Sequence, residues 1–111
     1  MTVKWVKVDP LVMNGEPFLY ASRLTVRQLL EERRSGYTVR DLQKDHPELR
    51  VLGIAAAYCY ADDHRERYAE FFDAEGALVG PGFSEIDAER LPPHLRRPGI
   101  VMERPTAPTP S

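Results

Sequence analysis

Residues 24–45 read LTVRQLLEERRSGYTVRDLQKD, a stretch that predicts two helices beginning in the same way. In each helix a threonine is followed three residues later by a polar side chain, Thr25 by Gln28 and Thr38 by Asp41. Such a pair forms a capping box, in which the hydroxyl accepts a free backbone N–H and the second side chain reaches back. The repeat therefore predicts two helix starts separated by one short turn.

A third, more apolar segment follows these two helices. Gly36 is a typical C-terminal residue of a helix and ends the first helix before the second one begins at Thr38. Residues 53–61, GIAAAYCYA, are apolar on nearly every side of a helix. That composition predicts a central buried helix running from about residue 51 to residue 72. Two capped helices, a tight turn and a packed third helix have the outline of a helix-turn-helix. Capping boxes occur in helical proteins of every kind, so a DNA-binding unit and a plain helical core both remain open.

The residues before the helices have the pattern of short strands. The segment TVKWVKV at residues 2–8 alternates polar and apolar side chains, as a half-buried strand does. Asn14-Gly15 is a strong turn signal, which predicts a β-hairpin or two short strands over residues 11–20. The fold class expected is therefore mainly α, with a short N-terminal β-element before a trihelical core.

The composition changes after residue 76, because seven of the ten prolines lie in residues 81–111. We therefore divide the chain into a core domain, residues 1–76, and a Pro-rich C-terminal extension, residues 77–111. Ser84 predicts the start of one short helix in the extension. Spaced apolar anchors make it either a partner-binding, partly disordered segment or a tail packed over its own core. These candidate partner-binding residues are Phe83, Ile86, Leu91, Leu95 and Ile100.

Charge and cysteine content limit the class of protein. Formal net charge is −2, but residues 1–50 carry +2 and residues 51–111 carry −4, so a polyanion would prefer the first half. The lone cysteine, Cys59, excludes an internal disulfide and fits a reducing cytoplasm. The start of the chain lacks the apolar core of a signal peptide, and no uncharged run is long enough for a bilayer. We expect a cytoplasmic protein with no membrane partner.

The residues themselves resemble a known family, domain-of-unknown-function family 433, over about residues 8–65. The ordered series that carries the resemblance is Gly15-Glu16-Pro17-Phe18-Leu19, Ser22-Arg23-Leu24, Gly36-Tyr37-Thr38-Val39-Arg40-Asp41-Leu42, His46-Pro47-Glu48-Leu49 and Ile54-Ala55-Ala56-Ala57-Tyr58. The resemblance implies a homeodomain-like helical fold after a short β-element. Many members are taken to be VapB-type antitoxins encoded beside a PIN-like ribonuclease toxin. One departure is Ala21, where the family usually has glycine, so a Cβ enters that turn.

Basic residues that flank or line the two short helices are the candidates for DNA contact, since they can neutralise phosphates. The alternative is an ordinary solvated surface, because acidic residues are interleaved with them and the third helix starts with apolar side chains that cannot read base edges. The candidate nucleic-acid-binding residues are Arg23, Arg27, Arg34, Arg40, Lys44 and Arg50.

Enzyme chemistry has little support in the sequence. No nucleophile elbow, Gly-rich phosphate loop or repeated Cys/His spacing is present, so we expect no enzyme, cofactor or metal. A chain this small cannot bury every aromatic residue near the end of the third helix, so a second copy or the residues after Gly80 are expected to cover some of them, and a homodimer is predicted. The function expected is an antitoxin that binds a PIN-like toxin and its own promoter DNA as a dimer. The alternative is a dimeric protein–protein interaction module without DNA binding.

Overall fold

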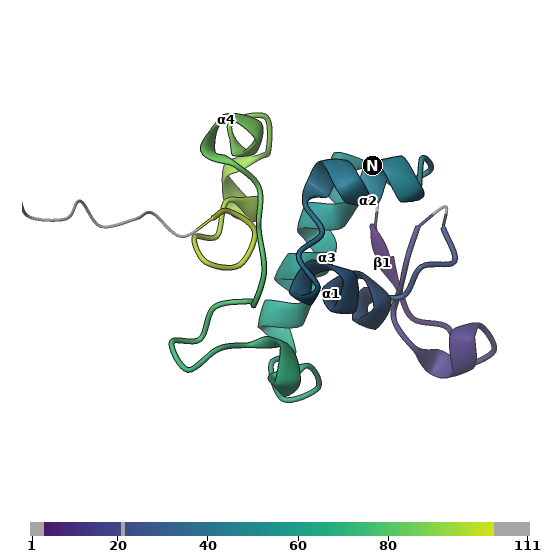
Figure 1. Ribbon diagram of the computed structural model, residues 1–111. Coiled ribbons are helices and arrows are strands. Elements are labelled where there is room, and N and C mark those ends of the chain that lie inside the picture. Colours follow the sequence, from purple (N-terminus) through teal and green to yellow (C-terminus); the bar gives the residue numbers. More distant parts are fainter. Residues whose placement is uncertain (1–3, 21, 104–111) are drawn as a thin grey trace, which may run out of the picture.

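The structure is a computed structural model that describes residues 4–20 and 22–103. It is a small mixed α/β domain, in which helices and short 3-10 turns surround a central helix and a two-stranded antiparallel sheet covers one side (Figure 1). In chain order the elements are β1 (Val6–Lys7), η1 (Met13–Gly15), β2 (Phe18–Leu19), α1 (Val26–Arg34), α2 (Val39–Asp45), α3 (Val51–Asp63), η2 (Ala69–Phe71), α4 (Glu85–Ala88) and η3 (Pro93–Leu95).

Both predicted helix starts are confirmed, each with a complete capping box. The Thr25 hydroxyl accepts the Gln28 N–H at 3.1 Å, and the Gln28 side-chain oxygen accepts the Thr25 N–H at 2.9 Å. Thr38 and Asp41 make the same reciprocal pair at 3.2 and 3.0 Å. Gly36 follows the C-cap of α1, Ser35, with φ +102°, a backbone angle that glycine adopts without steric cost. Interactions within a few residues therefore specify where both helices begin.

The two strands pair in an arrangement that differs from the predicted hairpin over residues 11–20. β1 pairs with β2, so Val6 lies opposite Leu19 and Lys7 opposite Phe18. The Asn14-Gly15 turn is present, with φ of 55° and 80°, but it lies inside a longer connection between the strands. Leu11, expected in a strand, is 94% exposed. The prediction missed this because the strand that pairs with Phe18–Leu19 precedes the loop.

Helix α3 is the centre of the core, but its predicted length is wrong. It ends at Asp63 instead of continuing to Phe72. The His64 ring stacks on the Tyr60 ring with centroids 4.0 Å apart, and its Nδ1 lies 2.8 Å from the Tyr60 carbonyl oxygen. The chain then turns back, which buries the Tyr68 and Phe71 side chains that a continued helix would expose.

The described part of the C-terminal extension, residues 77–103, packs on the opposite side of α3 from the sheet (Figure 1). Ser84 caps α4 as predicted, its hydroxyl accepting the Asp87 N–H at 3.2 Å. Phe83 and Val101 are almost fully buried in the same core as α1 and α3. Of the two alternatives for this segment, packing over its own core is the one present. Residues 104–111 lie outside the described part.

None of the helices in the described part of the chain has the length and apolar character needed to cross a lipid bilayer.

Candidate functional site

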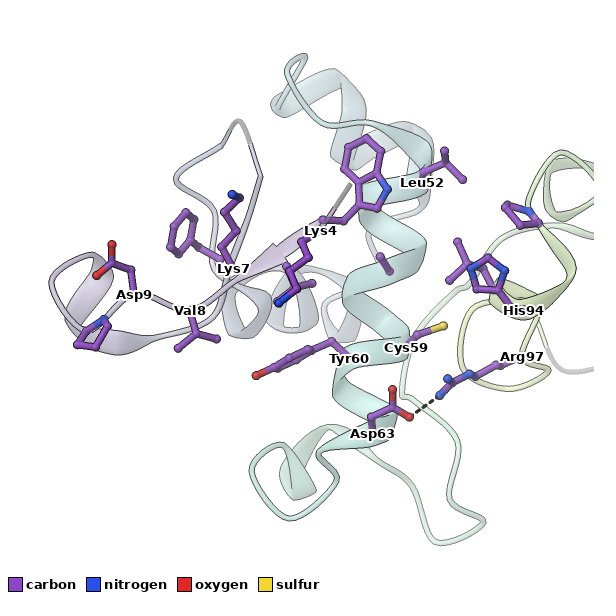
Figure 2. Close-up of a pocket in the computed structure, with 17 residues that line it drawn as sticks. Lys4, Lys7, Val8, Asp9, Leu52, Cys59, Tyr60, Asp63, His94 and Arg97 are labelled. Carbon is purple, nitrogen blue, oxygen red and sulfur yellow. Dashed lines mark hydrogen bonds and ion pairs between the residues drawn. The ribbon is translucent and has the colours of Figure 1, made fainter. Parts of the chain in front are cut away.

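A groove of about 1240 Å³ opens between the sheet and the C-terminal extension. Its floor is one face of α3, and its two walls are residues 4–10 around β1 and residues 92–97 around η3 (Figure 2). The groove therefore brings together three parts of the chain that are far apart in sequence. We call this depression the groove.

The floor follows from the spacing of side chains along α3. Leu52, Ala56, Cys59, Tyr60 and Asp63 recur at helical intervals, so they share one face of the helix. The face opposite packs against α1 and is buried. The floor is thus the part of an apolar helix that the chain's own elements leave partly open.

Trp5 sets the position of the β1 wall. A Cβ added at Gly53 would lie 3.2 Å from the Trp5 ring atom Cε3, closer than ordinary van der Waals contact. The Trp5 ring also meets the Tyr20 ring edge-on, with centroids 6.3 Å apart. Because glycine at position 53 lets the indole approach the helix, β1 is held close to α3.

The far wall carries an ion-pair cluster. Arg97 donates to Asp63 at 2.9 Å (Figure 2) and to Asp62 at 2.7 Å, which links the wall to the end of α3. The hydrogen bond to Asp63, with the second to Asp62, raises the pKa of Arg97. Burial raises the pKa of the neighbouring Cys59 thiol, so the reactive thiolate is disfavoured. These groups act as structural partners and leave Cys59 without activation.

The β1 wall carries two lysines, which, unlike Arg97, do not belong to an ion-pair cluster of the described residues. Lys4 and Lys7 are exposed, and neither forms an ion pair with any residue in the described ranges. The Lys7 ammonium lies 5.2 Å from the centroid of the Tyr20 ring. The groove therefore combines an apolar floor with a rim on which two lysines outnumber one exposed carboxylate, Asp9.

The six candidate nucleic-acid-binding residues divide into two groups. Arg27 donates to Glu70 and to the Arg67 carbonyl, and Arg34 lies over the Phe71 ring at 4.7 Å, so both hold η2 against α1. The remaining four are exposed and form no ion pair with another residue of the described part: Arg23, Arg40, Lys44 and Arg50. Ala21, which departs from the family pattern, lies outside the described residues.

The five candidate partner-binding residues also divide. Four are buried in the chain's own core, Phe83 at 1%, Leu91 at 2%, Ile100 at 5% and Leu95 at 9% exposure, and Leu95 also lines the groove. Ile86 on α4 is 73% exposed. In this conformation Ile86 is therefore the member of the set with most of its side chain open to a partner.

Sequence reasoning missed Arg33, which is 2% exposed. Its guanidinium donates to the Ile100 carbonyl and lies 4.5 Å from the centroid of the Tyr58 ring. Burial lowers the pKa of Arg33 and raises that of Tyr58 to about 12. The signal was present in the spacing, because position 33 continues the stripe of Val26, Leu29 and Leu30.

Metal binding has no support in the described residues, where no group of three or more His, Cys, Asp or Glu side chains is placed to hold an ion.

Comparison with known proteins finds no match among curated proteins or solved structures. A family model does match residues 6–61, which run from the first residue of β1 almost to the end of α3. That segment includes most of the floor and of the β1 wall of the groove, but it excludes Lys4, Trp5, Asp63 and the C-terminal extension. The chain belongs to the family described as Protein of unknown function (DUF433).

Proposed function

We propose that this protein works by binding other macromolecules and catalyses no reaction. The groove carries the proposal, because it offers an apolar floor, an open mouth and a charged rim, the features of a protein-docking surface. Its titratable groups are arranged for structure: Arg97 is occupied by two carboxylates and burial disfavours the Cys59 thiolate. A side chain activated for acid–base or nucleophilic chemistry would have the opposite character.

More specifically, the protein is an antitoxin-type protein that neutralises a PIN-like ribonuclease by binding it and represses its own promoter as a dimer. The family resemblance supplies this part of the proposal. The resemblance implies a homeodomain-like core, and what supports it is coarser: two capped helices, α1 and α2, are joined by a short turn, and α1 packs on α3. The mechanism is occlusion of the ribonuclease together with contact to operator phosphates.

DNA contact falls to the exposed corner around α2. Helix α3 cannot serve as a reading helix, because its side chains from Val51 to Asp62 are buried or half-buried. Arg40 and Lys44 lie one helical turn apart on α2 and are exposed. With Arg23 and Arg50 they supply four cations per subunit for phosphate contact, which carries affinity but little sequence information.

A second candidate function is a dimeric interaction module that never touches DNA. The observation that favours it is the mixture of charges at the corner, where exposed Asp41, Asp45 and Glu48 oppose the four cations. Such a surface has a weak positive potential and suits solvent as well as phosphate.

The antitoxin proposal is tested by co-expressing the chain with the tagged product of the adjacent gene. Co-elution in fixed stoichiometry, with lower toxicity than the neighbour alone, is the expected result. Absence of co-elution at equal expression would refute it.

The two candidates are separated by promoter binding across a salt series. Eight phosphate contacts in a dimer predict a log-affinity slope of about −7 against log-salt. The double reversal Arg40→Glu with Lys44→Glu should abolish DNA retention and leave toxin co-elution intact. A flat salt response, or full retention by this variant, would leave the interaction module as the function.

A further inference from the structure

The groove continues into an exposed apolar surface on the β1 side. After the strand, Val8 is 55% exposed, Leu11 is 94% exposed and Val12 is 37% exposed. Val8 itself lines the groove, so the apolar lining extends outward along this loop. Exposed apolar side chains next to an open groove mark a surface that another protein covers.

The charges of the groove restrict what can occupy it. Of its carboxylates, Asp63 is paired with Arg97, and Asp9, which accepts the Leu11 N–H at 2.9 Å and keeps its charge, is outnumbered by the two lysines of the same wall. Lys4 and Lys7 lack an ion-pair partner among residues 4–20 and 22–103. The best occupant is therefore a segment with an apolar anchor flanked by carboxylates.

Helix α4 presents such a segment on the same molecule. Ile86 is exposed, the exposed Glu89 follows it at the i+3 spacing of neighbours on a helix, and the exposed Glu85 immediately precedes it in the sequence. We call these three residues the α4 patch. Neither glutamate forms an ion pair with a residue that the structure describes.

The α4 patch is held in place before any partner arrives. The Ser84 hydroxyl caps the helix, and Arg96 donates to the Glu89 carbonyl at 2.8 Å and to the Leu91 carbonyl at 2.9 Å. Ala88 is fully buried against the chain's own core, so α4 cannot leave to fill the groove of its own molecule. A pre-ordered patch binds with less loss of conformational entropy than a flexible tail.

We infer that the groove is a dimer interface, in which the lysine rim and apolar floor of one copy receive the α4 patch of a second copy. This inference rests on the proposed function as a binding protein and names one partner of the groove. Two copies related by a twofold axis exchange the contact twice, each supplying one groove and one α4 patch. The net charge of the chain is divided in the same way: residues 1–50, which contain the lysine rim, carry +2, and residues 51–111, which contain the α4 patch, carry −4.

A charge-swap experiment on the full chain tests the inference. The rim variant is Lys4→Glu with Lys7→Glu, and the patch variant is Glu85→Lys with Glu89→Lys. Each should raise the dimer dissociation constant about thirtyfold, the effect of losing four surface ion pairs across the two contacts. Combining the rim and patch variants restores opposite charges and should restore dimerisation, as measured by analytical ultracentrifugation.

Two controls make the result specific. Arg40→Glu with Lys44→Glu reverses two exposed cations on α2 and should leave the dissociation constant unchanged. Ile86→Ala should weaken the dimer without changing charge. Trp5, the sole tryptophan, lines the groove, so its fluorescence should shift with protein concentration in the wild type and stay constant in the rim variant. Circular dichroism is the check that each variant is folded.

Several results would overturn the inference. A wild-type chain that remains monomeric at high micromolar concentration would do so, as would a dimer that the rim and patch variants leave unaffected. If the wild-type chain is monomeric and the rim variant no longer co-elutes with the tagged neighbour product, the groove is the binding site for that product instead. If the neighbour product does not co-elute but the charge swap changes dimerisation as expected, the antitoxin proposal is refuted and the dimer interface is supported.

Discussion

Replacing Arg33 with alanine should destabilise the fold more than any change to a neighbouring arginine. The Arg33 side chain joins α1 to the C-terminal extension through its bond to the Ile100 carbonyl, and it covers the Tyr58 ring. Arg34, the next residue, is exposed and lies over Phe71 at 4.7 Å. Arg34→Ala is therefore a matched control with the same change in helix propensity.

The expected size follows from the contacts that are lost. An unpaired buried carbonyl costs about 2 kcal/mol, a desolvated cation–π contact about 2 kcal/mol, and two buried methylenes about 1.6 kcal/mol. Removing a buried charge whose Nε has no hydrogen-bond partner in the described chain offsets about 2 kcal/mol of this. The net loss for Arg33→Ala is therefore about 3 to 4 kcal/mol, against about 0.5 to 1 kcal/mol for Arg34→Ala.

Urea unfolding followed by circular dichroism measures both values, provided that the two variants keep the same dependence on denaturant. Hydrogen exchange should show the loss first in residues 78–101, because these are the residues that Arg33 holds. Equal losses for Arg33→Ala and Arg34→Ala would refute the assignment of Arg33 as the link between the two parts.

Two further predictions concern backbone contact and pH. A Cβ at Gly80 would lie 2.0 Å from the Arg33 carbonyl oxygen, so Gly80→Ala should cost well over 2 kcal/mol in thermal or urea unfolding. Gly36→Ala, at nearly the same φ but with open space around it, should cost only about 1 to 2 kcal/mol, and equal losses would contradict this explanation. Burial raises the pKa of both Tyr58 and Tyr68 from 10.0 to about 12, so the fold favours the neutral phenols. Stability is full below pH 10 and should fall by about 1.4 kcal/mol per tyrosine per pH unit as pH rises towards 12. Tyr58→Phe should remove about half of this slope, and an unchanged slope in that variant would refute the cause.

Interactions within a few residues were predictable from the sequence. The helix starts at Thr25 and Thr38 depend on partners three residues away, and the stop at Gly36 depends on that residue's own backbone freedom. The cap at Ser84 belongs to the same class, since its partner is Asp87. For such features the chain needs no information from the rest of the fold.

The length of α3 and the residue at which it ends could not be predicted from the sequence, because packing decides between competing local preferences. The charged segment after Asp63 is compatible with a continued helix, and the burial of Tyr68 and Phe71 beneath α1 favours the turn instead. The same holds for Phe83, whose apolar character suits a partner as well as its own core. Area buried within the molecule decides between these outcomes.

The sequence by itself determined the local elements of this protein: two capped helices, a glycine stop, a turn and an apolar third helix. The tertiary structure alone decided that Arg33 is buried, that Ile86 is exposed, and that Lys4 lies across a groove from Arg97. The physical reason is distance along the chain. Arg33 and Ile100 are 67 residues apart, and the two walls of the groove are farther apart still, so their contacts form only once both segments have packed around α3.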